Sequence, residues 1–126
     1  MHPAKGLKAW EAANLLADEV RATVERFPRG RAYRLRNQLT AAADSISANI
    51  AEGSAGQSIP ERLRFYRSGL ASAQETITFI KRARAASLMG QRTYFRLTNR
   101  ANVTHSLTSA LIRRLERDNA RYRRSP

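Results

Sequence analysis

Apolar residues recur at intervals of three and four along most of the chain, a spacing that predicts helices. Four such stretches lie at about residues 7–26, 31–52, 59–89 and 93–122, and no stretch alternates convincingly in the manner of a strand. Short connections between long amphipathic helices make successive helices antiparallel neighbours. The pattern therefore predicts an all-α protein, an up-down-up-down antiparallel four-helix bundle. We expect residues 1–126 to form this single domain, with a basic C-terminal tail at 123–126.

Local signals predict where the helices begin and end. Pro28 pushes Phe27 out of the helical conformation, so the first helix should end there. Ser58 and Glu61 have the spacing of a capping box at the start of the third helix. Gly53 and Gly90 are expected to close the second and third helices, because glycine adopts the positive φ that commonly follows a last helical turn.

The second predicted helix is poor in bulky side chains and carries polar residues one turn apart. We interpret these residues as packing devices, with Asn49 hydrogen-bonded to a neighbouring helix or subunit and Glu75 as a natural partner from the third helix. The alternative is a functional pocket at the end of the bundle. The candidates for structural or oligomer packing are Ser45, Asn49, Glu52, Gly53 and Glu75.

The charged residues make this predicted bundle strongly basic. The chain has 23 Lys and Arg against 10 Asp and Glu, a formal net charge of +13. From residue 81 onward there are 12 basic and 2 acidic residues, against 11 and 8 in the first eighty. A field of this sign favours polyanions, with nucleic acid first and anionic membrane surfaces second.

The fourth predicted helix carries arginines in two rows. One row has a spacing of four, four and three and consists of Arg113, Arg117, Arg121 and Arg124. It lies opposite the expected core positions, which include Leu97, Leu111 and Leu115. The second row, on a flank of the helix, consists of Arg92, Arg96 and Arg100. These rows indicate a surface that contacts phosphates largely independently of sequence. The alternative is a solvated face whose basic end complements the helix macrodipole. The candidate nucleic-acid-binding residues are Arg92, Arg96, Arg100, Arg113, Arg117, Arg121 and Arg124.

The residues that catalysis and metal binding require are missing or scattered. The absence of cysteine excludes disulfides, thiolate zinc sites and cysteine nucleophiles. His2 and His105 are far apart in the sequence and have no HExxH spacing, so we expect no metal site. We also expect no catalytic residue and no cofactor. With no apolar run of about 20 residues and no secretion signal, the sequence predicts a cytoplasmic protein without a membrane partner.

Several segments together resemble one bacterial family. The densest match is the run Ser45–Gly53, SISANIAEG, and the resemblance covers roughly residues 7 to 90. It identifies the chain as similar to the four-helix-bundle family first noticed in intervening sequences of 23S rRNA genes. The chain departs from that pattern where Ala42 replaces a usual Arg, where Ala71 replaces a favoured Gly, and at Gly56-Gln57, which lacks the common Arg. The other matching residues are Leu7-Lys8-Ala9-Trp10, Phe27-Pro28, Leu35, Gln38-Leu39, Phe65, Ser72 and Glu75.

The resemblance implies a cytosolic bundle that assembles into a ring-shaped homopentamer. It also implies distant kinship to the accessory proteins of diversity-generating retroelements, basic pentamers that bind nucleic acid and a reverse transcriptase. Most members of the family have no established biochemical activity.

Taken together, the residues and the resemblance predict a non-enzymatic, homo-oligomeric, cytosolic protein that associates with RNA or DNA through arginine side chains. The alternative function is an oligomeric interaction scaffold that docks an acidic protein partner, for example a reverse transcriptase, without contacting nucleic acid. Binding to anionic membranes is a weaker third hypothesis, because no exposed apolar face with Trp or Phe flanks the arginine row.

Overall fold

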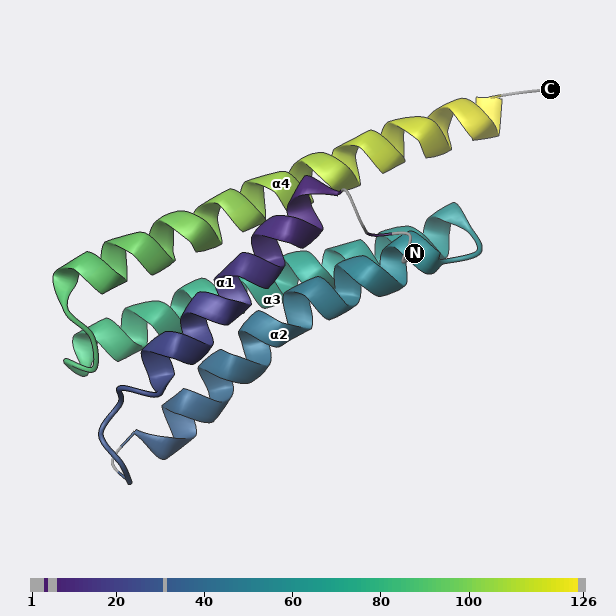
Figure 1. Ribbon diagram of the computed structural model, residues 1–126. Coiled ribbons are helices and arrows are strands. Elements are labelled where there is room, and N and C mark those ends of the chain that lie inside the picture. Colours follow the sequence, from purple (N-terminus) through teal and green to yellow (C-terminus); the bar gives the residue numbers. More distant parts are fainter. Residues whose placement is uncertain (1–3, 5–6, 31, 125–126) are drawn as a thin grey trace.

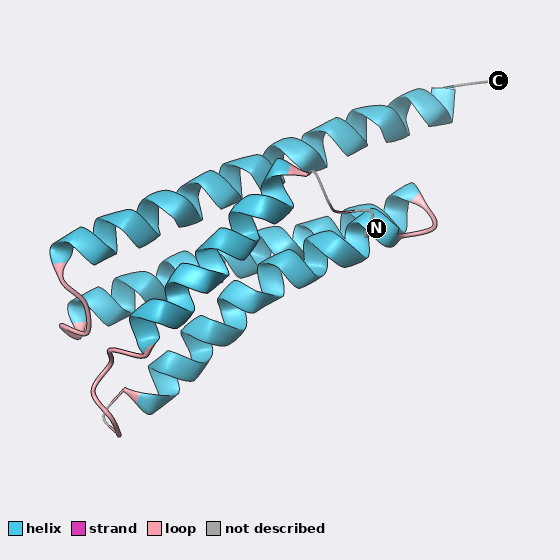
Figure 2. Cartoon of the chain, in the orientation of Figure 1, coloured by secondary structure: helices cyan, strands magenta, loops and turns pink. Residues whose placement is uncertain are grey.

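The computed structural model describes residue 4 and residues 7–30 and 32–124, and within them every regular element is a helix. The helices run alternately up and down along one bundle (Figure 1) and are joined by short loops (Figure 2). This confirms the predicted all-α, up-down-up-down four-helix bundle. The elements are α1 (Lys8–Val24), α2 (Tyr33–Ala55), α3 (Ile59–Ala85) and α4 (Gln91–Arg124).

The helices form a square in which α1 and α3 each pack against both α2 and α4. At 34 residues α4 is twice as long as α1, which has 17. Leu7, just before α1, lines the same hollow as Leu111, which lies just past the midpoint of α4. The end of α4 therefore extends past the start of α1 (Figure 1), and Tyr122 lies there beside Ile59 at the start of α3.

Small and aliphatic side chains from all four helices make most of the core, together with a few aromatic rings such as that of Tyr66. The stripe predicted on α4 is confirmed at Leu97, Ala101, Thr104, Thr108 and Leu115, which are buried, while Leu111 is half-buried. Two buried hydroxyls are satisfied within the helix: that of Thr104 donates to the carbonyl of Arg100 at 2.8 Å, and that of Thr108 to the carbonyl of Thr104 at 2.7 Å. This is how Thr104 and Thr108 place hydroxyl groups in an apolar core without leaving them unpaired.

The predicted start of α3 is also confirmed. The backbone N–H of Glu61 donates to the Ser58 hydroxyl at 3.2 Å, and the Glu61 carboxylate in turn accepts from the N–H of Gln57 at 3.3 Å. Pro60 occupies the first turn, where no helical hydrogen bond needs its missing N–H.

Both predicted glycine stops are wrong, because neither Gly53 nor Gly90 closes its helix. Gly53 lies inside α2, which continues to Ala55. It is buried, and its φ is not positive. The end of α3 comes at Ala85, and Ser87, with φ of 60°, takes the left-handed position expected of Gly90. The N–H of Ser87 donates to the Arg84 carbonyl at 3.0 Å and that of Leu88 to the Ala83 carbonyl at 2.9 Å, which is a Schellman motif.

The remaining boundaries differ from the prediction by a few residues. α4 begins at Gln91 and runs to Arg124, so the first two residues of the predicted basic tail are helical. Residues 31, 125 and 126, which the prediction placed in the second helix and the tail, lie outside the described residues.

Candidate nucleic-acid interface

The first arginine row lies on the outer face of α4, in its C-terminal part. Arg113, Arg117, Arg121 and Arg124 are all exposed, whereas Ile112 and Leu115 of the same turns are buried. The helix places these residues on one side because positions three and four apart share a face. The core contacts of α4 thus turn the sequence spacing into a continuous basic strip on its outer side.

The second arginine row is partly engaged inside the bundle. The Nε atoms of Arg100 and Arg96 lie 2.7 Å and 3.7 Å from the two carboxylate oxygens of Glu19 on α1. The Glu19 side chain is only 22% exposed, so solvent screens these ion pairs less than ordinary surface pairs. Arg92, at the start of α4, is exposed. The three arginines of this row therefore differ in their contacts. Arg96 and Arg100 form ion pairs that hold α1 to α4, whereas Arg92 is exposed.

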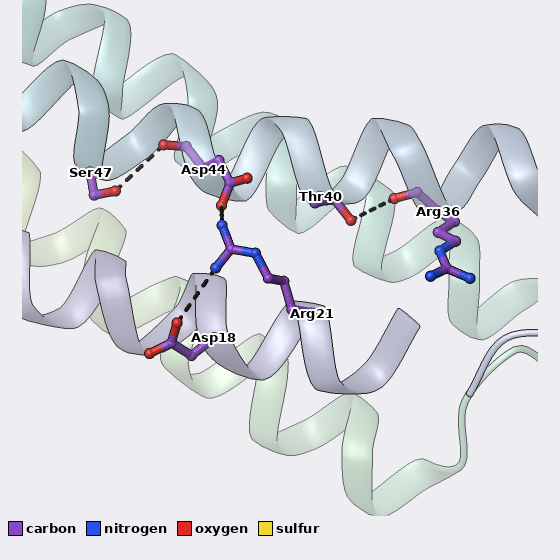
Figure 3. A network of polar contacts seen from close by, with 6 residues as sticks. All are labelled: Asp18, Arg21, Arg36, Thr40, Asp44 and Ser47. Carbon is purple, nitrogen blue, oxygen red and sulfur yellow. Dashed lines mark hydrogen bonds and ion pairs between the residues drawn. The ribbon is translucent and has the colours of Figure 1, made fainter. Parts of the chain in front are cut away.

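Other acidic side chains also neutralise particular arginines. Arg21 on α1 bridges Asp18 of its own helix, at 3.5 Å, and Asp44 on α2 (Figure 3). Arg67 on α3 lies 3.5 Å from Glu116 on α4. Glu116 thus faces α3 and leaves the outer strip of α4 more basic than the local sequence suggests.

A second group of basic residues was missed by the sequence analysis. The connection between α1 and α2 and that between α3 and α4 lie at the same end of the bundle (Figure 2). Arg26, Arg29 and Arg34 come to this end together with Arg82 and Arg92. The alternation of helix direction could have revealed this group, because it brings residues near 30 and near 88 to one end.

The polar residues of α2 form a layer between α2 and α3. The Ser45 hydroxyl lies 2.9 Å from that of Ser72, and the Asn49 amide donates to the Ser45 carbonyl at 2.8 Å and to its hydroxyl at 3.0 Å. The partner from α3 is therefore Ser72, whereas Glu75 and Glu52 are exposed. This geometry satisfies the polar groups within one chain, and a role in subunit packing stays a prediction for this layer.

A shallow hollow does lie at the end of the bundle where α1 begins, but the predicted polar residues are not in it. Its volume is about 260 Å³, and neither Ser45, Asn49 nor Glu52 lines it. Its wall instead includes Ser54, Arg62, Tyr66, Arg114 and Asp118. The Tyr66 hydroxyl is 3.1 Å from that of Ser54, and Arg62 Nε donates to the Gly53 carbonyl at 3.1 Å, so these groups tie the ends of α2 and α3 together.

Metal binding and membrane insertion find little support in the described part of the chain. There, no three His, Cys, Asp or Glu side chains are grouped to hold a metal ion, and His105 is half-buried on α4. His2 lies outside the described residues. None of the helices between residues 7 and 124, residue 31 aside, has the length and apolar character needed to cross a membrane.

Comparisons with known proteins agree with this architecture. A crystal structure of a protein of unknown function from the S23 ribosomal protein family of Bacteroides thetaiotaomicron has the same fold, with a TM-score of 0.77. It is 17% identical, and the alignment covers 82% of this chain and 97% of that one. No curated protein matches the chain. The model of the 23S rRNA-intervening sequence protein family matches residues 5–110, and the chain therefore belongs to that family.

Proposed function

We propose that this protein is a non-enzymatic, cytosolic module that binds RNA or DNA by contacting phosphates with arginine side chains. The observation that carries the proposal is the exposed strip on the outer face of α4, made by Arg113, Arg117, Arg121 and Arg124. Arginine pairs with phosphate through two parallel N–H donors, and its charge is retained at any physiological pH.

The distribution of acidic groups supports this assignment. Glu116, in the same turns of α4, is directed to Arg67 on α3, and Glu19 is directed to Arg96 and Arg100. These acids neutralise arginines between helices rather than along the outer strip. Neither acid pairs with Arg113 or Arg117 of the strip, and the charge of these two arginines attracts a polyanion and releases its counterions on binding.

Removing two arginines of the strip should weaken binding and flatten its salt dependence. For Arg113→Gln with Arg117→Gln, we expect the slope of log affinity against log salt to fall by about 1.5, because each lost phosphate contact removes about 0.7 to 0.9. Fluorescence anisotropy with single-stranded RNA and duplex DNA across a salt series measures this slope.

The matched control is Arg21→Gln with Arg67→Gln. Both double variants lower the formal net charge from +13 to +11, but Arg21 and Arg67 are paired with acids in the folded protein. The control should keep a slope close to that of the wild type. Equal slopes for the two variants would mean that total charge, and not the strip, governs binding. Absence of binding by the wild type even at about 50 mM salt would contradict the proposal and leave the scaffold for an acidic protein partner.

We further propose that the protein acts as a homo-oligomer, with the ring of five that the family resemblance implies. The seam between α1 and α4 supports self-association, because Leu15 and Val103 are 45% and 47% exposed there and α4 carries no charged residue between Arg100 and Arg113. A ring would repeat the arginine strip and multiply its effective affinity.

Sedimentation should therefore give about 71 kDa, five times the 14.2 kDa of one chain. Leu15→Gln with Val103→Gln should lower this mass, since both side chains are too exposed to be needed for folding of the subunit. A wild-type mass near 14.2 kDa would refute the ring. A variant that keeps the full mass would instead place the interface elsewhere.

A further inference from the structure

The end of the bundle that holds two of the three connections gathers basic residues from α2, α3, α4 and the connections themselves. We call it the two-loop end and define it as the described residues of 25–36 and 81–96 (Figure 1). The sequence of these segments contains one acidic residue, Glu25. Against it stand nine described basic residues. Arg36 is half-buried, Arg96 is exposed but lies 3.7 Å from Glu19 on α1, and the others are exposed. The nine are Arg26, Arg29, Arg34, Arg36, Lys81, Arg82, Arg84, Arg92 and Arg96.

Complementing the helix macrodipoles explains only part of this charge. α3 ends here, and Arg82 and Arg84 in its last turn interact favourably with the negative end of its dipole. α2 and α4 begin here, with Arg34, Arg36 and Arg92 near their positive ends and no acidic residue in either first turn. Arginine in those positions opposes the dipole, so the stability of the fold does not account for it. A polyanion bound at this end would account for it.

Two large exposed aromatic side chains lie at the two-loop end, one on α2 and one on α4, which are diagonal in the bundle. Tyr33, the first residue of α2, is 69% exposed and precedes Arg34. Phe95 is 57% exposed, three residues after Arg92, and the ring of Tyr94 lies against it with 5.7 Å between centroids. Rings this exposed contribute little to the core. An exposed aromatic face next to arginine is what an unpaired base stacks on, because every base presents a π-face while the adjacent arginine meets its phosphate.

We propose that the two-loop end binds single-stranded nucleic acid, with bases stacked on Tyr33 and Phe95 and the neighbouring arginines on the phosphates. The proposal rests on the nucleic-acid function argued above and specifies it, because a duplex keeps its bases stacked within itself and cannot offer them to these rings. The strip on α4 contacts phosphates of either form. The two-loop end would therefore add the preference for single strands.

The test replaces both rings and leaves every charge in place. Tyr33→Ala with Phe95→Ala is compared with Tyr122→Ala, which removes a ring that is 75% exposed near the opposite end of the bundle. Anisotropy is measured with oligouridylate and oligothymidylate of about 20 nucleotides and with a duplex of equal length. A thermal melt followed by circular dichroism confirms that each variant is folded.

We expect the double variant to bind both single strands about 30-fold more weakly, with duplex affinity within about twofold of the wild type. Tyr122→Ala should bind all three probes like the wild type. Unchanged single-strand binding by the folded double variant would overturn the inference, as would an equal loss for duplex and single strands. If Arg113→Gln with Arg117→Gln still weakens binding in that case, the proposed function stands and only the two-loop end is excluded. A wild type that binds no probe overturns both.

Discussion

Replacing Tyr66 with alanine is expected to lower the free energy of unfolding by about 4 kcal/mol, the range found for large aromatic side chains removed from cores. Tyr66 is 1% exposed and is the largest fully buried side chain among the residues that the structure describes. Its ring fills the space between α2 and α3, beside Gly53, and its hydroxyl reaches Ser54. Urea denaturation at one fixed protein concentration measures the change, since any self-association makes stability concentration-dependent.

The conservative variant Tyr66→Phe separates the ring from its hydroxyl. It should lose only about 1 kcal/mol, because the Ser54 hydroxyl keeps its hydrogen bond to the Ile50 carbonyl at 2.9 Å. If Tyr66→Phe lost as much as Tyr66→Ala, the polar contact rather than the packed ring would hold this end of the bundle together.

Replacing Gly53 with alanine is expected to cost about 2 kcal/mol, although alanine is the better helix former by about 1 kcal/mol. A β-carbon at position 53 would lie 2.5 Å from two ring carbons of Tyr66 and 3.1 Å from the carbonyl oxygen of Arg62. The Tyr66 ring has no room to withdraw, because it is buried and its hydroxyl is held by Ser54. The same denaturation experiment gives the value.

The Tyr66→Ala background is the matched control for this second prediction. Without the ring, Gly53→Ala should no longer destabilise and should instead add about 1 kcal/mol through helix propensity. A destabilisation that persisted in the double variant would mean that the Arg62 carbonyl, and not the ring, excludes a side chain at position 53.

These two residues also show how far the sequence could predict the fold. The apolar spacing was sufficient for four helices, their order and most core positions, since periodicity is a local property that survives folding. Gly53 was rightly singled out but wrongly explained. Its lack of a side chain serves the approach of Tyr66, 13 residues further along, and a contact between helices cannot be read from the φ preference of one residue.

The candidate site was likewise predicted only in part from the sequence. The spacing of Arg113, Arg117, Arg121 and Arg124 predicted an outward strip on α4, and the structure places all four on the exposed side. The sequence could not show that Arg96 and Arg100 are engaged by Glu19, because that carboxylate comes from α1. Likewise, Ser72 rather than Glu75 completes the polar layer of α2, since the register between two helices decides which side chains meet.

By itself the sequence determined the helices, the short connections, the family and a net charge of +13. It also showed that the excess positive charge lies after residue 81. Only the tertiary structure showed that these basic residues form two groups, because α4 carries the arginines of its first turns and those of its last turns to opposite ends of the bundle. Antiparallel packing then brought Arg92 and Phe95 on α4 to the same end of the bundle as Tyr33 and Arg34 on α2, residues about sixty positions away in the chain. Composition fixes the net charge, but the antiparallel order of the helices decides which charged residues lie at the same end of the bundle.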